Sequence, residues 1–414
     1  MSGRVPEIPG TRIRPGSDQE AWLRGTVGRM CQVAPQCFPG SQPVSFAQGD
    51  LVKLESQDFW VCEKSDGIRV LLVVCTDPIS KTQMVYLVDR KNDYYELQGL
   101  FFPHHENPQT PMLNTVVDGE LVYDIDPRTN QETMRFLAFD CLVVNDQNVM
   151  SRPLDKRYGR LKEWFYKPFA TMKRDHSHVI QSHPFDIQVK DIRFSYHAEQ
   201  VFADMANLQH GCDGLIYTCV NAPYTPKTDT NILKWKQPSE NSIDFKLILR
   251  FPPLHDNPSQ PDYHAKPVFL LQVWCGGNQY ETYDQMYVDN DEWERMKSSG
   301  EQYDDRIVEV HWDPSVSSWR WMRFRNDKPN GNYRGTVENI VQSIMDGVEK
   351  DTLLERSNSI RTAWKARQLL VPPQPQPQPS APLALPPLEL RYGRLATSQW
   401  SRVSGPSIVA GMNR

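Results

Sequence analysis

Short runs of β-branched and aromatic residues, separated by turn-forming residues, constrain the fold of this 414-residue chain more than any other feature. Such runs predict strands, because branched and aromatic side chains pack well on a pleated surface. The predicted strands are 58–63, 70–75, 84–88, 115–122, 134–140, 242–251 and 266–274. Two stretches between them, 154–166 and 196–209, have apolar residues three and four apart, as amphipathic helices do. We therefore predict an α+β fold with antiparallel sheets.

The strand pattern changes near Gln237 and Pro238. After this point strands come at shorter intervals, with one charged helical stretch at 290–299, as in a small barrel of about five strands. The sequence thus predicts a first domain over residues 1–237 and a barrel domain over residues 238–335.

The end of the chain differs from the rest in composition. Apolar residues recur at helical spacing from residue 336 onward, which predicts a C-terminal helix over 336–368. Between Val371 and Pro387, eight of seventeen residues are proline, and such a segment favours extended polyproline II over helix or central strand. We predict a proline-rich disordered tail over 369–414.

Charge and hydropathy exclude two classes of protein. The formal net charge is -5, and the excess of acidic residues lies before residue 351. An acidic body does not coat nucleic acid through a general field, so any contact with RNA or nucleotide must be focused in a cleft. No apolar run approaches the roughly 20 residues that a membrane span needs, and we expect no membrane partner.

The strongest local motif is Lys64-Ser65-Asp66-Gly67-Ile68-Arg69, which lies between an aromatic and an apolar strand. Asp-Gly turns the chain, so the amine of Lys64 and the guanidinium of Arg69 could face one bound ligand. Lysine and Asp-Gly are also common in solvated hairpin turns, and this motif alone does not separate the two interpretations.

Other strands carry charged residues at their ends. These segments are Asp118-Gly119-Glu120, Arg135 to Asp140, Asp213-Gly214-Leu215-Ile216, Leu233-Lys234-Trp235-Lys236 and Trp319 to Lys328. Because alternate residues of a strand share a face, we expect Lys234 to lie beside Lys236, and Arg323 beside Arg325. Taken singly, each segment also fits a hairpin end or a solvated strand face.

Together and in this order, the motifs resemble the covalent nucleotidyltransferase superfamily, and within it the alpha-subunit guanylyltransferases of fungal-type mRNA capping enzymes. The resemblance covers about residues 38–335. The segment 38–46 and the sequence Met322-Arg323-Phe324-Arg325 are similar to the capping branch rather than to polynucleotide ligases. The fold it implies is a nucleotidyltransferase domain over 1–237, with antiparallel sheets, followed by an OB-fold domain over 238–335.

The resemblance implies a two-step reaction. Lys64 would be the catalytic nucleophile that attacks the α-phosphorus of GTP, forms a covalent lysyl-N-GMP intermediate and releases pyrophosphate. GMP would then pass to the 5′-diphosphate end of nascent mRNA and form the GpppN cap. The GTP-binding residues that the resemblance implies are Arg69, Glu120, Phe139, Ile216, Lys234, Lys236, Arg323, Arg325, Asp327 and Lys328.

Several roles follow from the same resemblance. Arg69 and Glu120 would lie at or near the ribose, and Phe139 and Ile216 would sandwich the guanine, although ordinary strand core explains these two equally well. Glu120 and Asp213 would hold Mg²⁺ or Mn²⁺, which suit carboxylate and phosphate oxygens.

The resemblance also implies partners and a location. These are an RNA 5′-triphosphatase subunit on a separate chain, the phosphorylated C-terminal repeats of RNA polymerase II, and the nucleus. Two alternatives stay open: an ATP-dependent polynucleotide ligase with the same lysine chemistry, and a non-catalytic scaffold with the same fold.

Overall fold

The computed structural model describes residues 6–175, 183–370, 408–409 and 412–413. It divides into two compact units, Met1–Trp364 and Lys365–Arg414. In the second unit β19 (Ile408–Val409) pairs with β20 (Met412–Asn413), while residues 371–407 of the predicted tail lie outside the described residues. In the described part of the chain, no helix is long and apolar enough to span a membrane.

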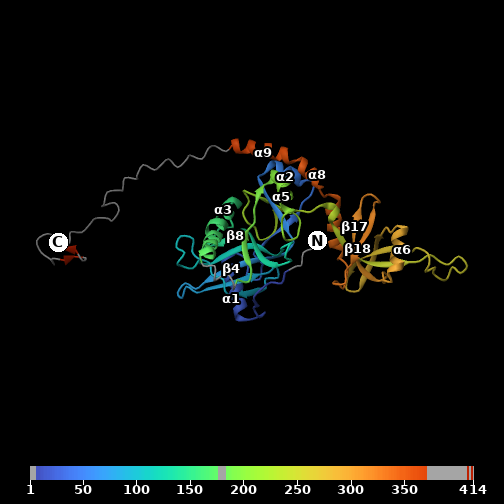
Figure 1. The fold of residues 1–414 in the computed structure, drawn as a ribbon, viewed down its shortest axis with the longest axis horizontal. Helices are drawn as coiled ribbons and strands as arrows, with labels where there is room; N and C mark the ends of the chain where they lie inside the picture. Colours follow the sequence, from blue (N-terminus) through green and yellow to red (C-terminus); the bar gives the residue numbers. More distant parts are fainter. Residues whose placement is uncertain (1–5, 176–182, 371–407, 410–411, 414) are drawn as a thin grey trace. The chain divides into compact units, whose positions relative to one another are not determined.

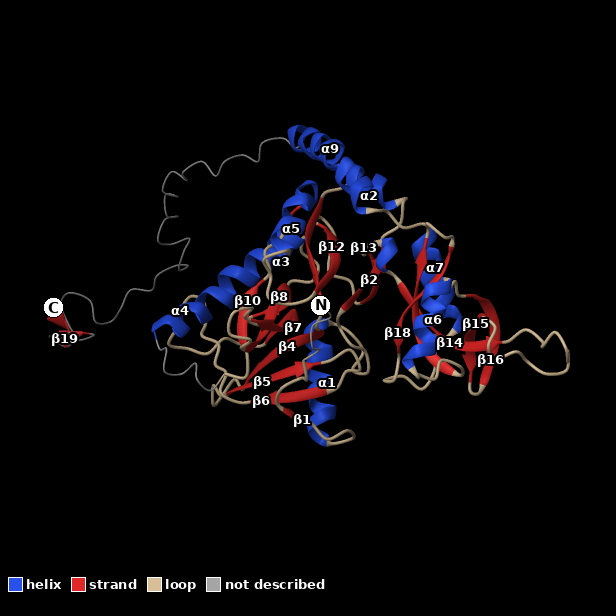
Figure 2. Cartoon of the chain, turned by 45° about the vertical axis from the view of Figure 1, so that its right-hand side comes forward, coloured by secondary structure: helices blue, strands red, loops and turns tan. Residues whose placement is uncertain are grey.

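The largest sheet has β4 at its centre (Figures 1 and 2). Its strand order is β1 (Thr11–Arg12), β6 (Tyr94–Leu97), β5 (Gln83–Val88), β4 (Ile68–Thr76), β7 (Thr115–Ile125), β8 (Glu132–Val144) and β10 (Asp186–Val189), with β9 (Gln147–Asn148) paired to β8. All neighbours are antiparallel except β8 and β10, which are parallel. The prediction of antiparallel sheets is therefore correct for all but one pairing of this sheet.

Both faces of this sheet are buried, which explains the continuous apolar run in β4. Val70 and Leu72 point into a core formed with Phe165, whereas Leu71 and Val73 point into a core on the opposite face. Helices α3 (Leu154–Arg160) and α4 (Lys167–Asp175), joined by the π-helical turn η1 (Leu161–Tyr166), cover one face, and α1 (Asp18–Cys31) covers the other. A strand with two buried faces cannot show an alternating pattern.

A second sheet holds the lysine motif. Its order is β11 (Arg193–Phe194), β3 (Phe59–Ser65), β12 (Cys212–Cys219), β13 (Lys227–Trp235) and β2 (Ser41–Ser45). The pairing of β13 with β2 is parallel, which is a second exception to the antiparallel prediction. Its core is completed by α2 (Asp50–Ser56), by the 3-10 turn η3 (Ser195–His197) leading into α5 (Ala198–Met205), and by residues from the C-terminal helices.

The third sheet forms a barrel of OB type. Its order is β16 (Gln279–Gln285), β15 (Val268–Gly276), β14 (Ser242–Arg250), β17 (Arg306–Asp313) and β18 (Ser318–Phe324), all antiparallel. A parallel bridge between Met286 and Trp319 brings the two edges together. Helix α6 (Asn290–Ser299) contributes Met296 to the barrel core. The 3-10 turn η4 (Pro238–Glu240) connects β13 to this domain.

The predicted single helix over 336–368 is wrong in its continuity. The segment forms α7 (Arg334–Met345), α8 (Lys350–Glu355) and α9 (Ser357–Leu370). The physical reason is that its apolar residues face two cores: Val337 is buried in the barrel, whereas Val348 and Leu353 are buried against the second sheet. One straight helix cannot serve both, and the chain breaks at Gly347, where a Cβ would lie 2.4 Å from Pro238.

Candidate active site

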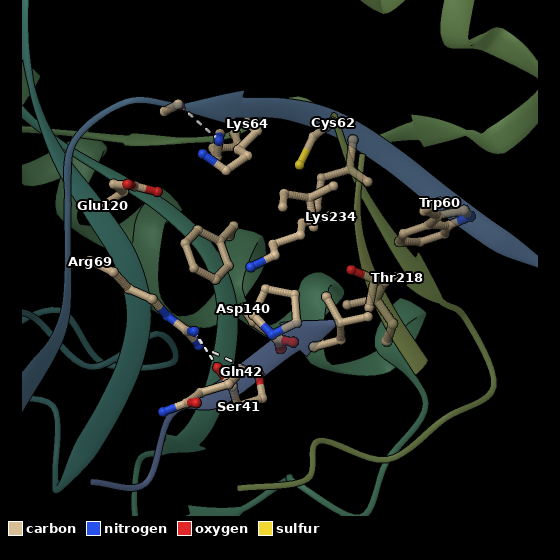
Figure 3. A pocket seen from close by; sticks show the side chains of 18 of the residues that line it. Ser41, Gln42, Trp60, Cys62, Lys64, Arg69, Glu120, Asp140, Thr218 and Lys234 are labelled. Carbon is tan, nitrogen blue, oxygen red and sulfur yellow. Dashed lines mark hydrogen bonds between the residues drawn. The ribbon is translucent and has the colours of Figure 1, made fainter. Parts of the chain in front are cut away.

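A cavity of about 450 Å³ lies between the first two sheets (Figure 3). Six of the predicted site residues line it, each from a different strand: Lys64, Arg69, Glu120, Phe139, Ile216 and Lys234. In Figure 3, Lys64 and Glu120 lie at one end of the cavity and Trp60 and Thr218 at the other. Residues that are far apart in the sequence thus face one enclosed space.

Lys64 is the last residue but one of β3, immediately before the tight turn into β4. The turn requires glycine, because a Cβ on Gly67 would lie 2.1 Å from the carbonyl oxygen of Leu121. The ammonium of Lys64 forms an ion pair with Asp213, and its side chain is 28% exposed. The motif therefore presents the amine at the cavity wall, which a freely solvated hairpin turn would not do.

Asp213 reaches Lys64 because β12 is irregular at this point. The register between β12 and β3 shifts between Cys212 and Leu215, and Gly214 has a φ of +151°. Lys236 approaches the same carboxylate, with its Nζ 3.8 Å from Oδ2 of Asp213. Lys236 lies one residue beyond the end of β13 and is not among the residues that line the cavity, but Asp213 interacts electrostatically with both Lys234 and Lys236.

Arg69 is held rigidly at the cavity wall. It binds Asp118 through two nitrogens, and it also donates to the carbonyl oxygen of Ser41 and to the hydroxyl of Tyr224 at 3.2 Å. Burial alone would lower the pKa of this guanidinium, but the Asp118 carboxylate outweighs burial and raises it. Arg69 is consequently a fixed positive charge with a defined orientation.

Glu120 and Lys190 form the charged end of the cavity. Burial raises the pKa of Glu120 above its usual value, although Lys190 and Lys64 oppose the shift. Lys190 donates to the carbonyl oxygen of Glu63 at 2.8 Å and to the Ser65 hydroxyl at 2.9 Å. Burial would lower the pKa of Lys190, but the Glu63 carboxylate raises it. Lys190 is therefore a buried ammonium held by Glu63 and Ser65, the residues on either side of Lys64.

The remaining predicted cavity residues come from the two facing sheets. Phe139 lies on β8 and Ile216 on β12, so both could contact a flat ligand. Lys234 lies on β13, and its pKa is lowered first by burial and then by repulsion from Lys64 and Arg90.

Several residues that line the cavity were missing from the sequence prediction. Arg90, Lys190 and Tyr224 all line the cavity. They lie in loops or at a strand end, without the acidic-glycine or alternating-lysine pattern that marked the other segments. No local signal in a single sequence could have identified them.

The four residues predicted from the last motif lie on the barrel and do not line the described cavity. Arg325 donates to both oxygens of Asp244 at 3.0 Å, and Lys328 pairs with the same carboxylate. Arg323 donates to Glu309 at 2.6 Å, with 59% of its side chain exposed. Hydrogen bonds from Arg325 lower the pKa of Asp327. Acidic partners on the barrel therefore neutralise most of this positive charge.

The described residues contain no group of three or more His, Cys, Asp or Glu side chains arranged to hold a metal ion. Glu120 and Asp213 supply only two carboxylates. Mg²⁺ in nucleotide-dependent enzymes is commonly held by one or two carboxylates together with substrate phosphates. The donor set thus fits a metal that arrives with a triphosphate.

Comparison with known proteins agrees with the sequence resemblance. The family described as "mRNA capping enzyme, catalytic domain" matches residues 6–238, and "mRNA capping enzyme, C-terminal domain" matches residues 240–354. The mRNA-capping enzyme subunit alpha of Yarrowia lipolytica is 39% identical over 89% of this chain and 93% of the relative. The chain belongs to the mRNA capping enzyme family.

Family membership confirms the predicted activity and fold class. The chain is an mRNA guanylyltransferase with a nucleotidyltransferase domain and an OB-like C-terminal domain. The mRNA-capping enzyme subunit alpha of Saccharomyces cerevisiae is 35% identical over 89% of both chains. Among solved structures, mycobacterial DNA ligase D complexed with ATP and MES is similar over 70% of this chain and 95% of that chain. The TM-score is 0.35 and the sequence identity 15%, and this similarity is too low to bear on function.

Proposed function

We propose that the cavity between the first two sheets is the guanylyl-transfer site of this enzyme and that Lys64 is its nucleophile. The observation that carries the proposal is the position of the Lys64 amine. It faces the cavity beside Asp213, while Arg69 and Glu120 face the same space from the opposite sheet. A nucleotide bound there would contact the Lys64 amine and the fixed charges of Arg69 and Glu120 at the same time.

The first step forms one bond and breaks another at the α-phosphorus. Nζ of Lys64, after losing a proton, attacks the α-phosphorus of GTP and forms a P–N bond, and the bond to the bridging oxygen breaks with pyrophosphate as leaving group. In the second step an oxygen of the RNA 5′-diphosphate attacks the same phosphorus and releases Lys64. The result is a 5′-to-5′ triphosphate link between GMP and RNA.

The surrounding cations would stabilise the charge that develops during transfer. Lys234 lines the cavity and Lys236 approaches Asp213, which supports a role for both in contacting α-phosphate oxygens. Fixed positive charges near a transferring phosphoryl group are the largest catalytic contribution in this kind of chemistry. Phe139 and Ile216 would hold the guanine between β8 and β12.

The barrel residues would serve the β- and γ-phosphates. Arg323, Arg325 and Lys328, oriented by Asp327, would contact these phosphates once the barrel closes over bound GTP. Closure needs a partner exchange, because Arg325 and Lys328 are paired with Asp244. Phosphate oxygens would replace these carboxylate contacts, which makes closure dependent on the nucleotide.

Glu120 and Asp213 would hold Mg²⁺ or Mn²⁺. Burial of Glu120 favours a bound cation, because a buried carboxylate is stabilised by an adjacent positive charge. The ion would neutralise phosphate charge and, by engaging Asp213, leave the Lys64 amine free to lose its proton. Enzymes of the nucleotidyltransferase class generally use divalent metals.

The relatives that are named as subunit alpha support a second capping subunit. We propose that this partner is an RNA 5′-triphosphatase on a separate chain, which supplies the 5′-diphosphate end. Nascent transcripts place the reaction in the nucleus and favour contact with the phosphorylated C-terminal repeats of RNA polymerase II. The proline-rich segment within residues 369–414 is a candidate for such contacts.

The test is covalent labelling with α-labelled GTP or ATP plus Mg²⁺ or Mn²⁺, followed by denaturing electrophoresis. We expect label from GTP alone, stable to alkali and labile to acid, in the wild type and in Lys167→Ala, whose lysine lies exposed on α4. Lys64→Ala should show none. Label retained in Lys64→Ala would refute the assignment of the nucleophile, and label from ATP would support the ligase alternative.

A further inference from the structure

The hydroxyl of Tyr224 joins three parts of the cavity wall that come from different elements. Tyr224 lies in the loop between β12 and β13 and is only 4% exposed. Its hydroxyl accepts hydrogen bonds from the backbone N–H of Ser41 at 3.0 Å and from Arg69 at 3.2 Å, and it donates to Asp118. Two acceptor positions and one donor use the full capacity of a hydroxyl group.

The position of this hydroxyl is set by the fold. The backbone N–H of Tyr224 donates to the carbonyl oxygen of Met150 at 2.7 Å, and the guanidinium of Arg157 lies 5.7 Å from the centre of the ring. Arg157 in turn donates to the carbonyl oxygen of Ala222 in the same loop at 3.0 Å. The ring is therefore anchored from its far side, and the hydroxyl does not depend on a ligand for its orientation.

The bonds made by this hydroxyl control how Arg69 meets a ligand. Asp118 binds Nε and Nη2 of Arg69, and the carbonyl oxygen of Ser41 binds Nη1. The hydroxyl adds a further fixed point on Nη2, and through its bond from the N–H of Ser41, the first residue of β2, it also fixes the segment that carries the Ser41 carbonyl. Ser41, Arg69 and Tyr224 all line the cavity.

We infer that Tyr224 is a positioning residue that sets the orientation of Arg69 toward the ribose of bound GTP. The inference rests on the proposed function, in which this cavity binds GTP with Arg69 at or near the ribose. Tyr224 acts through Arg69 and Ser41 and makes no contact with the reacting phosphorus. Its loss should weaken recognition of the sugar without stopping the chemistry.

The test measures GTP affinity by calorimetry in the Lys64→Ala background, where no covalent intermediate can form. Tyr224→Phe keeps the ring and removes only the hydroxyl. We expect about a tenfold weaker Kd for GTP, equivalent to about 1.4 kcal/mol. We also expect Tyr224→Phe to weaken the binding of one deoxy analogue less than that of GTP. This analogue is 2′-deoxy-GTP or 3′-deoxy-GTP, whichever lacks the hydroxyl that Arg69 recognises. With Lys64 present, the apparent KM for GTP should rise while the maximal rate of lysyl-GMP formation changes less than about twofold.

The matched control is Tyr217→Phe. Tyr217 is a fully buried tyrosine of β12, and its hydroxyl has no hydrogen-bond partner among the described residues. This variant should bind all three nucleotides as the parent does. An unchanged Kd in Tyr224→Phe, or an equal loss for GTP and both deoxy analogues, would overturn the inference, because a purely structural tyrosine gives no sugar preference.

Two further outcomes separate this inference from the proposed function. If the wild type forms no lysyl-GMP but Tyr224→Phe weakens GTP binding with the expected sugar preference, the proposed reaction fails and the inference stands. If Tyr224→Phe does not fold, 3-fluorotyrosine at position 224 keeps the ring and makes the hydroxyl a weaker acceptor. A Kd for GTP raised at least about twofold then supports the role, and an unchanged Kd overturns it.

Discussion

The ion pair between Asp140 and Arg157 gives the sharpest test of what holds the catalytic domain together. The two side chains are 6% and 2% exposed, and two nitrogens of Arg157 donate to the two oxygens of Asp140 at 2.8 Å. Asp140→Asn preserves the shape of the side chain but removes its charge. The guanidinium would remain buried, facing an amide that can no longer neutralise it.

The magnitude follows from this geometry. Removing one partner of a buried pair costs about 3–5 kcal/mol, because the other charge is left uncompensated. Arg157 keeps hydrogen bonds to the carbonyl oxygens of Arg152 at 2.6 Å and Ala222 at 3.0 Å. We therefore expect the lower end, about 3 kcal/mol, which at about 3 kcal/mol per molar urea lowers the unfolding midpoint by about 1 M.

The assay is urea unfolding followed by tryptophan fluorescence. Glu163→Gln is the control, since the exposed pair of Glu163 and Lys167 has side chains that are 59% and 68% accessible. Exposed ion pairs contribute little to stability, and the control midpoint should move by less than about 0.3 M. A loss below about 1 kcal/mol in Asp140→Asn, or a loss equal to that of the control, would refute the reasoning.

Three other expectations follow from the cited contacts. Burial lowers the pKa of Lys234, and the neighbouring cations Lys64 and Arg90 lower it further, so GTP affinity should fall at a lower pH than the deprotonation of a free lysine would give. Arg90→Gln should move that fall to higher pH in a binding titration, and an unmoved alkaline limb contradicts this. Burial raises the pKa of Asp124, but hydrogen bonds and positive neighbours outweigh burial and lower the pKa below its usual value. The stabilisation from Asp124 is therefore present above about pH 4 and is lost as the pH falls further. Asp124→Asn should reduce the loss of unfolding free energy at acid pH, measured by urea unfolding, and an unchanged loss counts against this expectation. Gly214→Ala should reduce lysyl-GMP formation at least about tenfold. The new Cβ would lie 2.0 Å from the carbonyl oxygen of Trp235, so the strand must shift and displace the carboxylate of the adjacent Asp213. Labelling at the wild-type level would show instead that the strand accommodates the methyl group.

Local patterns in the sequence identified several of the long strands and six of the residues that line the cavity. Strand β4 (Ile68–Thr76) could be predicted over 70–75 because that stretch is an uninterrupted apolar run rich in valine. Lys64 could be singled out because it precedes a Ser-Asp-Gly turn and because the other charged motifs follow it along the chain. A solvated hairpin turn explains the lysine motif alone, but it does not explain the whole series of motifs. The resemblance to capping enzymes then supplied roles that no single residue carries by itself.

The helix predicted over 336–368 shows where local patterns fail. Helical spacing shows that apolar residues would share one face of a helix, but it does not show which core that face packs against. Val337 and Leu353 belong to different cores, so tertiary packing divides the segment into three helices. The two parallel strand pairings were missed for the same reason, because pairing partners are chosen by packing across the domain.

By itself the sequence determined several of the long strands, the order of the motifs and the family, since these depend on residue type and spacing along the chain. Only the tertiary structure decided that Tyr224, Lys190 and Arg90 join the cavity, and that the barrel cations are held by Asp244 and Glu309. The physical reason is that a site is an arrangement of side chains from separate elements. Hydrogen bonds and ion pairs across those elements form only after the sheets have packed together.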